Sequence, residues 1–228
     1  MEPSNTHAGK AGSYDLGRPE YPAAFYDYLY GEFGLSSSTV IADIGAGPGK
    51  VTQGFLERGS RVYAVEPDAD MRCILQERLN SFADCTVLGN CAEDTGIPTG
   101  CVDLIFCGNS YHWFDRARVV LEFKRILKPG TGANVVLAML MDSRHNESPE
   151  FREGAFETKS LEFVKCQDWD TYLNGMLSAS SSPNPGDDRF EEYCQGKKQH
   201  FDRHSRNGKL KTKFKLSCMI GNVNDLVP

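Results

Sequence analysis

Short apolar runs alternate with longer stretches of mixed polarity through the first two thirds of the chain. Five of these runs have the length and composition of buried strands, at 40–43, 61–65, 85–88, 102–107 and 134–141. Stretches such as 69–82 lie between them and carry apolar residues at the spacing of an amphipathic helix. Strands that alternate with helices favour a parallel sheet with right-handed crossovers. The pattern therefore predicts an α/β fold, a doubly wound and mostly parallel sheet with helices on both faces.

The two ends of the chain are less regular. Residues 1–12 are small and polar, which predicts disorder, and aromatic residues after Pro22 predict a helix there. Behind the fifth strand we expect a strand, two helices and a last strand, at 156–165, 169–179, 187–204 and 210–220. Asp187 or Asp188 is the expected N-cap of the second of these helices, because a short acceptor side chain satisfies free backbone N–H groups.

Composition narrows the classes of function. The 228 residues suffice for a sizeable core, and the formal net charge of −6 gives no reason to expect binding to nucleic acid or to a membrane. No apolar run approaches the roughly 20 residues that cross a bilayer, and the polar N-terminus lacks the apolar centre of a signal peptide. The eight cysteines form no Cys-x-x-Cys pair, and their scatter points to a reducing cytoplasm.

One segment departs from the acidic average. Between 197 and 215 there are eight Lys or Arg residues and a single acid, Asp202. A basic patch can steer an anionic substrate or RNA. We favour a solvated helix face followed by a strand margin, because no aromatic stacking pattern accompanies the charges.

The most informative stretch follows the first strand. Asp43 closes the apolar run, and a Gly-x-Gly-x-Gly turn at 45–49 leads into a helical pattern. Glycine permits positive φ and lets the backbone pass close to a ligand, and the helix start behind it offers free N–H groups. A dinucleotide fingerprint would need glycine where this chain has Lys50, and an ordinary strand-to-helix turn is the alternative. The candidate ligand contacts here are Asp43, Gly45, Ala46 and Gly47.

The second strand ends at a carboxylate, Glu66, followed by Pro67. Open α/β sheets bind ligands at the carboxyl ends of their strands, and a carboxylate there can accept hydrogen bonds from both hydroxyls of a ribose. The alternative for Glu66 is a charge placed at a helix start by the helix dipole. Met71, one helical turn further on, would pack on an adenine face or in the core.

The third and fourth strand ends carry the other candidates. Cys91, Ala92 and Glu93 would approach the base of the ligand, with a solvated loop as the alternative for Glu93. Asn109 would face the reacting end of the ligand. Beyond it, His112 is the candidate general base, or else a turn residue bound to backbone. Tyr111 and Trp113 are the candidate substrate contacts, and Asp115 is expected to cap a helix.

Taken in order, these motifs resemble the type 11 family of class I S-adenosylmethionine-dependent methyltransferases. The resemblance is carried by Tyr-x-x-x-Arg-Pro-x-Tyr-Pro at 14–22, Asp-x-Gly-x-Gly-x-Gly at 43–49, Val-Glu-Pro at 65–67, Ala-Glu-Asp-Thr-Gly-Ile-Pro at 92–98, His-Trp-Phe-Asp at 112–115 and Leu-Lys-Pro-Gly at 127–130. Cys91 departs from the family, because it stands where the family has an acid that takes the adenine amino group. A thiol is a poor acceptor, so backbone groups or Asp94 would serve instead.

The resemblance implies a seven-stranded sheet with an antiparallel last strand and S-adenosyl-L-methionine as cofactor. It also implies that Tyr14 and Arg18 lie near the methionine end of that cofactor, with lid packing as the alternative for both residues. We expect one domain over 1–228. Its parts would be a lid helix in 14–35, a cofactor-binding core in 36–142 and substrate-side helices with the last strands in 143–228.

The expected function is methyl transfer to a small-molecule acceptor, a carboxylate or a hydroxyl, in the cytoplasm. We expect no metal, no nucleic acid and no membrane partner. Two alternatives remain open from the sequence. One is a nicotinamide-dependent oxidoreductase on a similar fold, which the glycine spacing disfavours. The other is a non-catalytic relative that keeps the cofactor pocket.

Overall fold

The computed structural model describes residues 9–130, 132, 134–142 and 155–227. Two compact units divide the chain between them. Residues 21–161 and 215–228 form one, here called the sheet unit, and residues 1–20 and 162–214 form the other, here called the helical unit. We expected a single domain. Two long strands, β6 (Phe156–Gln167) and β7 (Leu210–Gly221), each contribute residues to both units, which the sequence pattern does not reveal.

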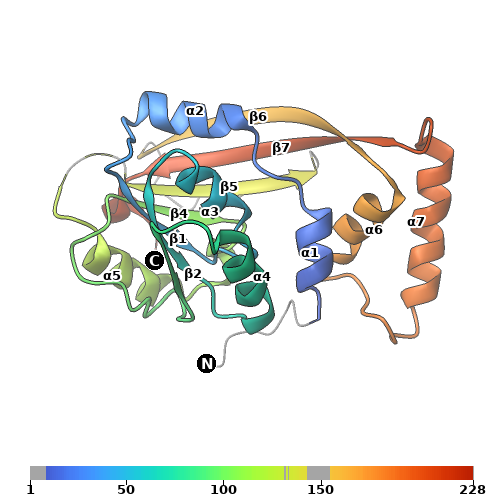
Figure 1. The fold of residues 1–228 in the computed structure, drawn as a ribbon, viewed down its shortest axis with the longest axis horizontal. Helices are drawn as coiled ribbons and strands as arrows, with labels where there is room; N and C mark the ends of the chain where they lie inside the picture. Colours follow the sequence, from blue (N-terminus) through green and yellow to red (C-terminus); the bar gives the residue numbers. More distant parts are fainter. Residues whose placement is uncertain (1–8, 131, 133, 143–154, 228) are drawn as a thin grey trace. The chain divides into compact units, whose positions relative to one another are not determined.

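The sheet follows the predicted doubly wound plan. Its seven strands stand in the order β3-β2-β1-β4-β5-β7-β6 (Figure 1). The first five strands are β1 (Val40–Ile44), β2 (Arg61–Val65), β3 (Cys85–Leu88), β4 (Leu104–Gly108) and β5 (Val135–Asp142). Each of their four pairings is parallel. The carboxyl ends of these strands therefore meet at one edge of the sheet, where open α/β sheets bind ligands.

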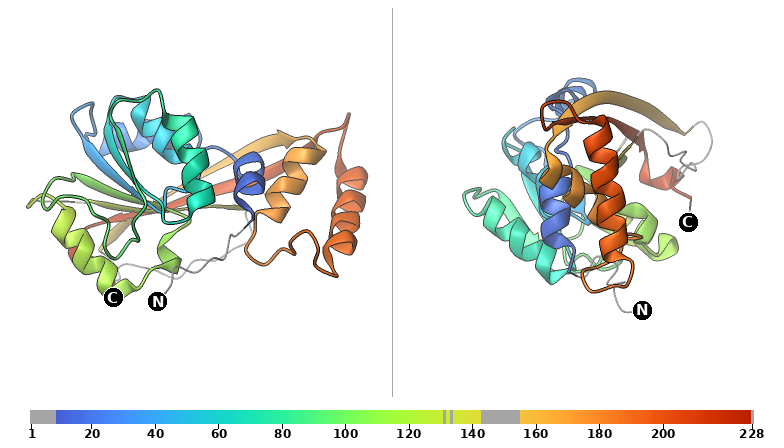
Figure 2. Two further views of the ribbon diagram at one scale, coloured as in Figure 1. Left: turned by 60° about the horizontal axis from the view of Figure 1, so that its bottom comes forward. Right: turned by 90° about the vertical axis from the view of Figure 1, so that its right-hand side faces the viewer.

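Helices cover both faces of this sheet. On one side lie α2 (Ala23–Glu32), α3 (Lys50–Leu56) and α4 (Ala69–Leu79), and α5 (Arg116–Ile126) lies on the other (Figure 2). Side chains alternate along β4 to reach the two layers. Phe106 meets Phe25 and Phe55 edge-on with ring centroids 5.9 and 5.5 Å apart. Its neighbours on β4, Ile105 and Cys107, belong to the opposite core, which α5 supplies.

The helical unit contains α1 (Ala11–Gly17), α6 (Trp169–Leu177) and α7 (Phe190–His204). Helices α1 and α6 cross so closely that a Cβ on Gly17 would lie 1.9 Å from the backbone nitrogen of Gly175. Before α1, the buried Lys10 donates through Nζ to the carbonyl oxygens of Ala179 and Ser182. These contacts join segments that are far apart in the sequence.

Two local predictions were wrong. The disorder expected over 1–12 does not extend to its end, because Lys10 is buried and α1 begins at Ala11; residues 1–8 lie outside the described part. The expected caps of α7 are also incorrect. Its N-cap is Arg189, and the Asp187 carboxylate instead accepts a hydrogen bond from the backbone N–H of Asn184.

Candidate functional site

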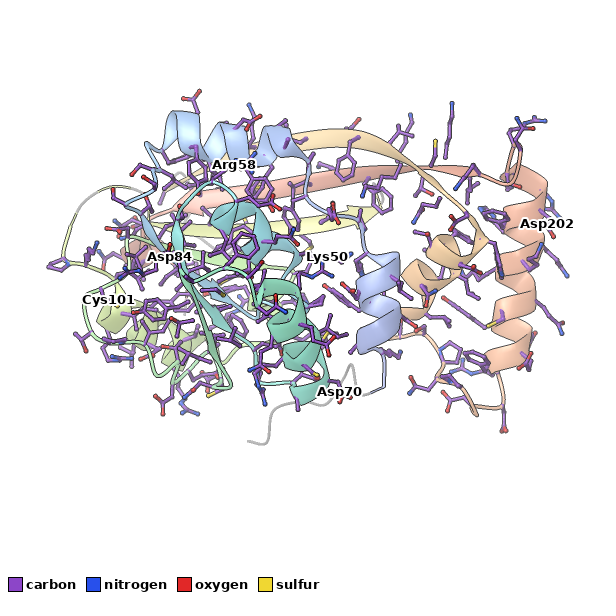
Figure 3. The ribbon with its side chains drawn as sticks, in the orientation of Figure 1. Lys50, Arg58, Asp70, Asp84, Cys101 and Asp202 are labelled. Carbon is purple, nitrogen blue, oxygen red and sulfur yellow. The ribbon has the colours of Figure 1, made fainter. Side chains whose placement is uncertain are left out.

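The glycine turn between β1 and α3 is held by hydrogen bonds to the neighbouring strand. Gly45, Gly47 and Gly49 all have positive φ, at 74°, 56° and 80°, which a residue with a Cβ adopts only at a cost. The backbone N–H groups of Gly45 and Ala46 donate to the carbonyl oxygen of Val65, at 2.9 and 3.0 Å. The turn is thus fastened to the end of β2, and α3 begins directly behind it at Lys50 (Figure 3).

Two of the three glycines have different surroundings. A Cβ on Gly45 would lie 2.5 Å from the Cβ of Ser110, so the protein's own packing requires glycine there. A Cβ on Gly47 would meet no atom within 4 Å. The backbone at Gly47 therefore borders open space, and glycine there leaves room for a bound molecule to approach the backbone.

Glu66 follows β2 and is hydrogen-bonded directly to the turn. Its side chain is 7% exposed, and its two oxygens accept hydrogen bonds from the N–H groups of Gly47 and Asp68, at 2.8 and 2.9 Å. Burial raises the pKa of Glu66, and the two backbone hydrogen bonds oppose that rise. A carboxylate oxygen can accept more than one hydrogen bond, so Glu66 keeps the capacity to bind a sugar hydroxyl.

The residues after Glu66 serve the local structure. The carbonyl oxygens of Glu66 and Pro67 accept hydrogen bonds from Nη1 of Arg72, at 2.8 and 2.9 Å. Met71 is buried, and its backbone N–H donates to the Asp68 carboxylate at the start of α4. These contacts support the packing alternative for Met71, and contact of Pro67 or Met71 with a cofactor stays a prediction.

Asp43 is the most deeply buried acid of the turn, with 1% of its surface exposed. Its Oδ2 accepts a hydrogen bond from the hydroxyl of Thr52 at 2.6 Å, which joins β1 to α3. Burial raises the pKa of Asp43 to about 7 despite this hydrogen bond. The sequence did not single out Thr52, although a hydroxyl on the first turns of α3 is the signal that would have found it. Cofactor contact by Asp43 stays a prediction.

The third strand end lies beside Glu66. Val65 pairs with Leu88, and the N–H of Glu66 donates to the carbonyl oxygen of Leu88. The turn that follows brings Cys91 opposite Asp94, with Cys91 partly exposed and Ala92 buried. The carboxylate of Glu93 accepts a hydrogen bond from the backbone N–H of Asp115 at 2.8 Å, which ties this turn to the next one.

At the fourth strand end, two neighbouring side chains bind the strands on either side. Asn109 has a φ of 54°, and its amide nitrogen donates to the carbonyl oxygen of Leu140 in β5 at 3.2 Å. Its amide oxygen accepts from the N–H of Leu140 at 2.8 Å. Ser110, which the sequence reading missed, donates to the carbonyl oxygen of Ile44 in β1 at 2.7 Å. The three strand ends are thus fixed relative to one another.

The short 3₁₀ turn η1 (Tyr111–Trp113) follows directly. Tyr111 is packed in the core against Phe114 and Phe123, whereas His112 and Trp113 are exposed, Trp113 by 44%. Neighbouring protein atoms remove part of the hydration of the His112 ring and lower its pKa, which favours the neutral imidazole. The prediction that Asp115 caps α5 is confirmed, because its carboxylate accepts from the N–H of Arg118.

Tyr14 and Arg18 belong to the helical unit. Nε of Arg18 donates to the hydroxyl of Ser178 at 2.9 Å, and its guanidinium carbon lies 5.2 Å from the centre of the Tyr14 ring. Both contacts support the packing alternative, and a role of this pair at a cofactor stays a prediction. The structure brings the candidates of the sheet unit together at the strand ends and leaves these two in the other unit.

Within the described residues, no three His, Cys, Asp or Glu side chains gather closely enough to hold a metal ion. None of the described helices has the length and apolar character needed to cross a bilayer. The chemistry that this part of the chain offers is therefore that of the strand ends: backbone N–H groups, buried carboxylates and an exposed imidazole beside an indole.

A family model matches part of the chain. Residues 42–133 match the profile described as "Methyltransferase domain". An uncharacterized methyltransferase of Mycobacterium tuberculosis is 35% identical over 119 residues, which cover 52% of this chain and 46% of that protein. An uncharacterized methyltransferase of Schizosaccharomyces pombe is 31% identical over 137 residues, which cover 60% of this chain and 52% of that protein. The chain thus spans about half the length of the curated relatives it matches.

Solved structures share the fold. A candidate type II methyltransferase from Anaeromyxobacter dehalogenans aligns with a TM-score of 0.66 at 21% identity, over 90% of this chain and 98% of that one. A phosphoethanolamine N-methyltransferase from Haemonchus contortus, solved with S-adenosylhomocysteine, aligns with a TM-score of 0.55 at 14% identity, over 95% of this chain and 58% of that one. At these identities the likeness concerns the fold alone.

Proposed function

We propose that the protein transfers a methyl group from S-adenosyl-L-methionine to a small-molecule acceptor. Residues 42–133 match the methyltransferase-domain family, and the chain shares its fold with a solved methyltransferase structure. The observation that carries the proposal is the open space at Gly47. No protein atom would meet a Cβ there, and the buried carboxylate of Glu66 accepts the N–H of that same glycine. An adenosyl group needs both features, because its ribose passes close to the turn and offers two hydroxyl donors.

Each strand end would take one part of the cofactor. Glu66 accepts hydrogen bonds from the ribose hydroxyls, and the turn at 45–47 approaches the sugar and the chain beyond it. The segment Cys91–Glu93 lies beside Glu66 and faces the base, with backbone groups in place of the acid that Cys91 replaces. When bound, the cofactor supplies an electrophilic methyl group, so the protein need not activate that carbon.

The protein's remaining tasks are to align the acceptor and to exclude water. His112 stands at the end of β4 as a partly dehydrated imidazole, and its lowered pKa keeps it neutral and able to accept a proton from a hydroxyl acceptor. A carboxylate acceptor would need no base. The exposed ring of Trp113 lies 5.0 Å from the His112 ring, centre to centre, and offers an apolar surface against which an acceptor can be positioned.

Two experiments test the proposal. Calorimetric titration with S-adenosylmethionine, S-adenosylhomocysteine and NADH should give binding with the first two and none with NADH. Turnover with a methyl-labelled donor should then be measured against a panel of small carboxylic acids and alcohols. Binding of NADH alone would favour an oxidoreductase and overturn the proposal. Binding of S-adenosylhomocysteine without turnover of any acceptor in the panel would favour a non-catalytic relative.

A further inference from the structure

A buried acid outside the family motifs holds the segment that follows β3. Glu122 lies on α5 and is 6% exposed. Its Oε1 accepts hydrogen bonds from the backbone N–H and the hydroxyl of Thr95, at 2.8 and 2.5 Å. Nε and Nη2 of Arg125 donate to its two oxygens, at 2.6 and 2.7 Å. Burial alone would raise the pKa of Glu122, but the hydrogen bonds from Arg125 and Thr95 outweigh it and lower that pKa, so the carboxylate is ionised.

Arg125 extends the same contacts further along the chain. Its Nη2 also donates to the carbonyl oxygen of Ile97 at 2.8 Å, and its Nη1 donates to the hydroxyl of Thr99 at 3.0 Å. The hydroxyl of Thr95 accepts the N–H of Ile97 at 3.2 Å. We call Glu122, Arg125 and Thr95 together the loop clamp. It fixes three positions in a segment that forms no strand or helix of its own.

The clamped segment is continuous with the third strand end. Cys91, Ala92 and Glu93 are separated from Thr95 only by Asp94. The strand that leads into the segment ends at Leu88, whose carbonyl oxygen accepts the N–H of Glu66. The bond from the N–H of Asp115 to Glu93 gives the segment a further link to the start of α5. A change in the position of Thr95 would therefore be passed to Cys91, Ala92 and Glu93, a few residues before it in the chain.

The contacts of the loop clamp are not well explained as a way to raise the free energy of unfolding. Only the Glu122 carboxylate is buried, because the Arg125 side chain is 38% exposed. Solvent screens a pair of this kind, and the cost of removing the carboxylate from water offsets much of its attraction. What a buried carboxylate with four donors does provide is one defined backbone conformation, because each donor must be in place to satisfy it. The loop clamp therefore selects a conformation for the segment rather than simply adding stability.

We infer that Glu122 and Arg125 are positioning residues, which act through Thr95 to hold Cys91–Glu93 in the conformation that receives the base of the cofactor. This inference rests on the proposed function, because it takes an adenosyl cofactor as the ligand. According to this inference, two residues of α5 determine how well the base is bound, and they act through the segment rather than by touching the ligand.

The test uses two variants of the loop clamp and two controls. Glu122→Gln keeps the shape and removes the charge that Arg125 binds, and Thr95→Val removes one hydroxyl. Thr95→Ser restores that hydroxyl and is the rescue control. Lys128→Met removes an ion pair of similar length, to Asp103 at 2.8 Å, and neither of these two residues takes part in the loop clamp. The measurements are calorimetric affinity for S-adenosylhomocysteine, hydrogen exchange over 91–97, and thermal unfolding to show that each variant is folded.

We expect Glu122→Gln and Thr95→Val each to weaken the affinity roughly tenfold, as for the loss of a buried or charged hydrogen bond, and to speed exchange over 91–97. Thr95→Ser and Lys128→Met should stay within roughly twofold of the wild type. Wild-type affinity in both clamp variants, or equal losses in Thr95→Val and Thr95→Ser, would overturn the inference while leaving the proposed function intact. A wild type that binds no S-adenosylhomocysteine would overturn both.

Discussion

The carboxylate of Glu66 accepts the backbone N–H of Gly47 across 2.8 Å, so the residue expected to bind a ribose also shapes the turn beside it. The second oxygen accepts the N–H of Asp68. One buried side chain thereby sets the relative positions of two strand ends before any ligand arrives, which lowers the cost of ordering the site on binding.

Glu66→Ala should therefore weaken binding of S-adenosylhomocysteine by about 2 kcal/mol or more, roughly thirtyfold, because both the ribose acceptor and the support of the turn are lost. Titration calorimetry measures this directly. The control is Glu57→Ala. It removes an exposed carboxylate just after α3, which accepts a hydrogen bond from the side chain of Gln53, and this variant should bind like the wild type. An unchanged affinity in Glu66→Ala would remove Glu66 from the site.

Gly45 and Gly47 should respond differently to alanine. Both have positive φ, so each replacement carries a strain of about 1–2 kcal/mol. Gly45→Ala also collides with the Cβ of Ser110, and we expect it to destabilise the protein by a further 1–3 kcal/mol or so. Gly47→Ala meets no protein atom and should instead weaken cofactor binding. Urea unfolding and calorimetry separate the two effects, and equal losses of stability would contradict the distinction.

Asp43 should make stability depend on pH. Its pKa is raised from an ordinary 3.8 to about 7, so between these values the folded protein keeps a proton that the unfolded chain releases. Stability should therefore fall as the pH rises through this window. Asp43→Asn removes the titrating group, and its gain in unfolding free energy over the wild type should be larger near pH 8 than near pH 5. The same gain at both pH values would show that Asp43 is ionised throughout.

Asn109 can be tested by separating its backbone from its side chain. Asn109→Gly keeps the positive φ and loses both hydrogen bonds to Leu140, and Asn109→Ala loses the bonds and adds a strain of about 1 kcal/mol. Both should loosen the turn that carries His112. The chain has two tryptophans, so in a Trp169→Phe background the fluorescence of Trp113 reports on this turn. Unaltered Trp113 fluorescence in both variants would mean that Asn109 does not hold the turn.

The crossing of α1 and α6 offers a test within the helical unit. Gly17→Ala should destabilise the protein by about 1–3 kcal/mol, because its Cβ would overlap the backbone of Gly175. Gly12 lies in the same helix with nothing within 4 Å of its Cβ position. Gly12→Ala should therefore stabilise by about 0.5–1 kcal/mol, since alanine favours a helix. Thermal unfolding gives both values, and a harmless Gly17→Ala would argue against the close crossing.

The parts of the fold that the sequence predicted are those that depend on neighbours in the chain. The strands 61–65 and 85–88 have the predicted bounds, and the first strand extends one residue past the predicted end at Asp43. A run of apolar residues and its flanking turn signals are local features of the sequence. The glycine turn, Glu66 at a strand end and the cap at Asp115 were found for the same reason. Helix α1 was missed because its burial depends on α6, far along the chain.

The contacts that fix the site could not be predicted from neighbouring residues in the sequence. Ser110 binds Ile44 across 66 positions of sequence, Asn109 binds Leu140 across 31, and Thr95 binds Glu122 across 27. Each of these side chains, read alone, is an ordinary polar residue in a loop or on a helix. Only the arrangement of the strands shows which polar group lies opposite it, and the division of the chain into two units follows from the same long-range contacts.

Both partners of the Asn109 amide are main-chain atoms of position 140. The identity of the side chain at that position therefore does not enter the bond, and any residue that keeps the strand can serve as its partner. Side chains along β5 can therefore be exchanged without altering the contact that holds Asn109, three residues before His112. Under the proposed methyl transfer, side chains of β5 could change in evolution while the position of the imidazole is kept.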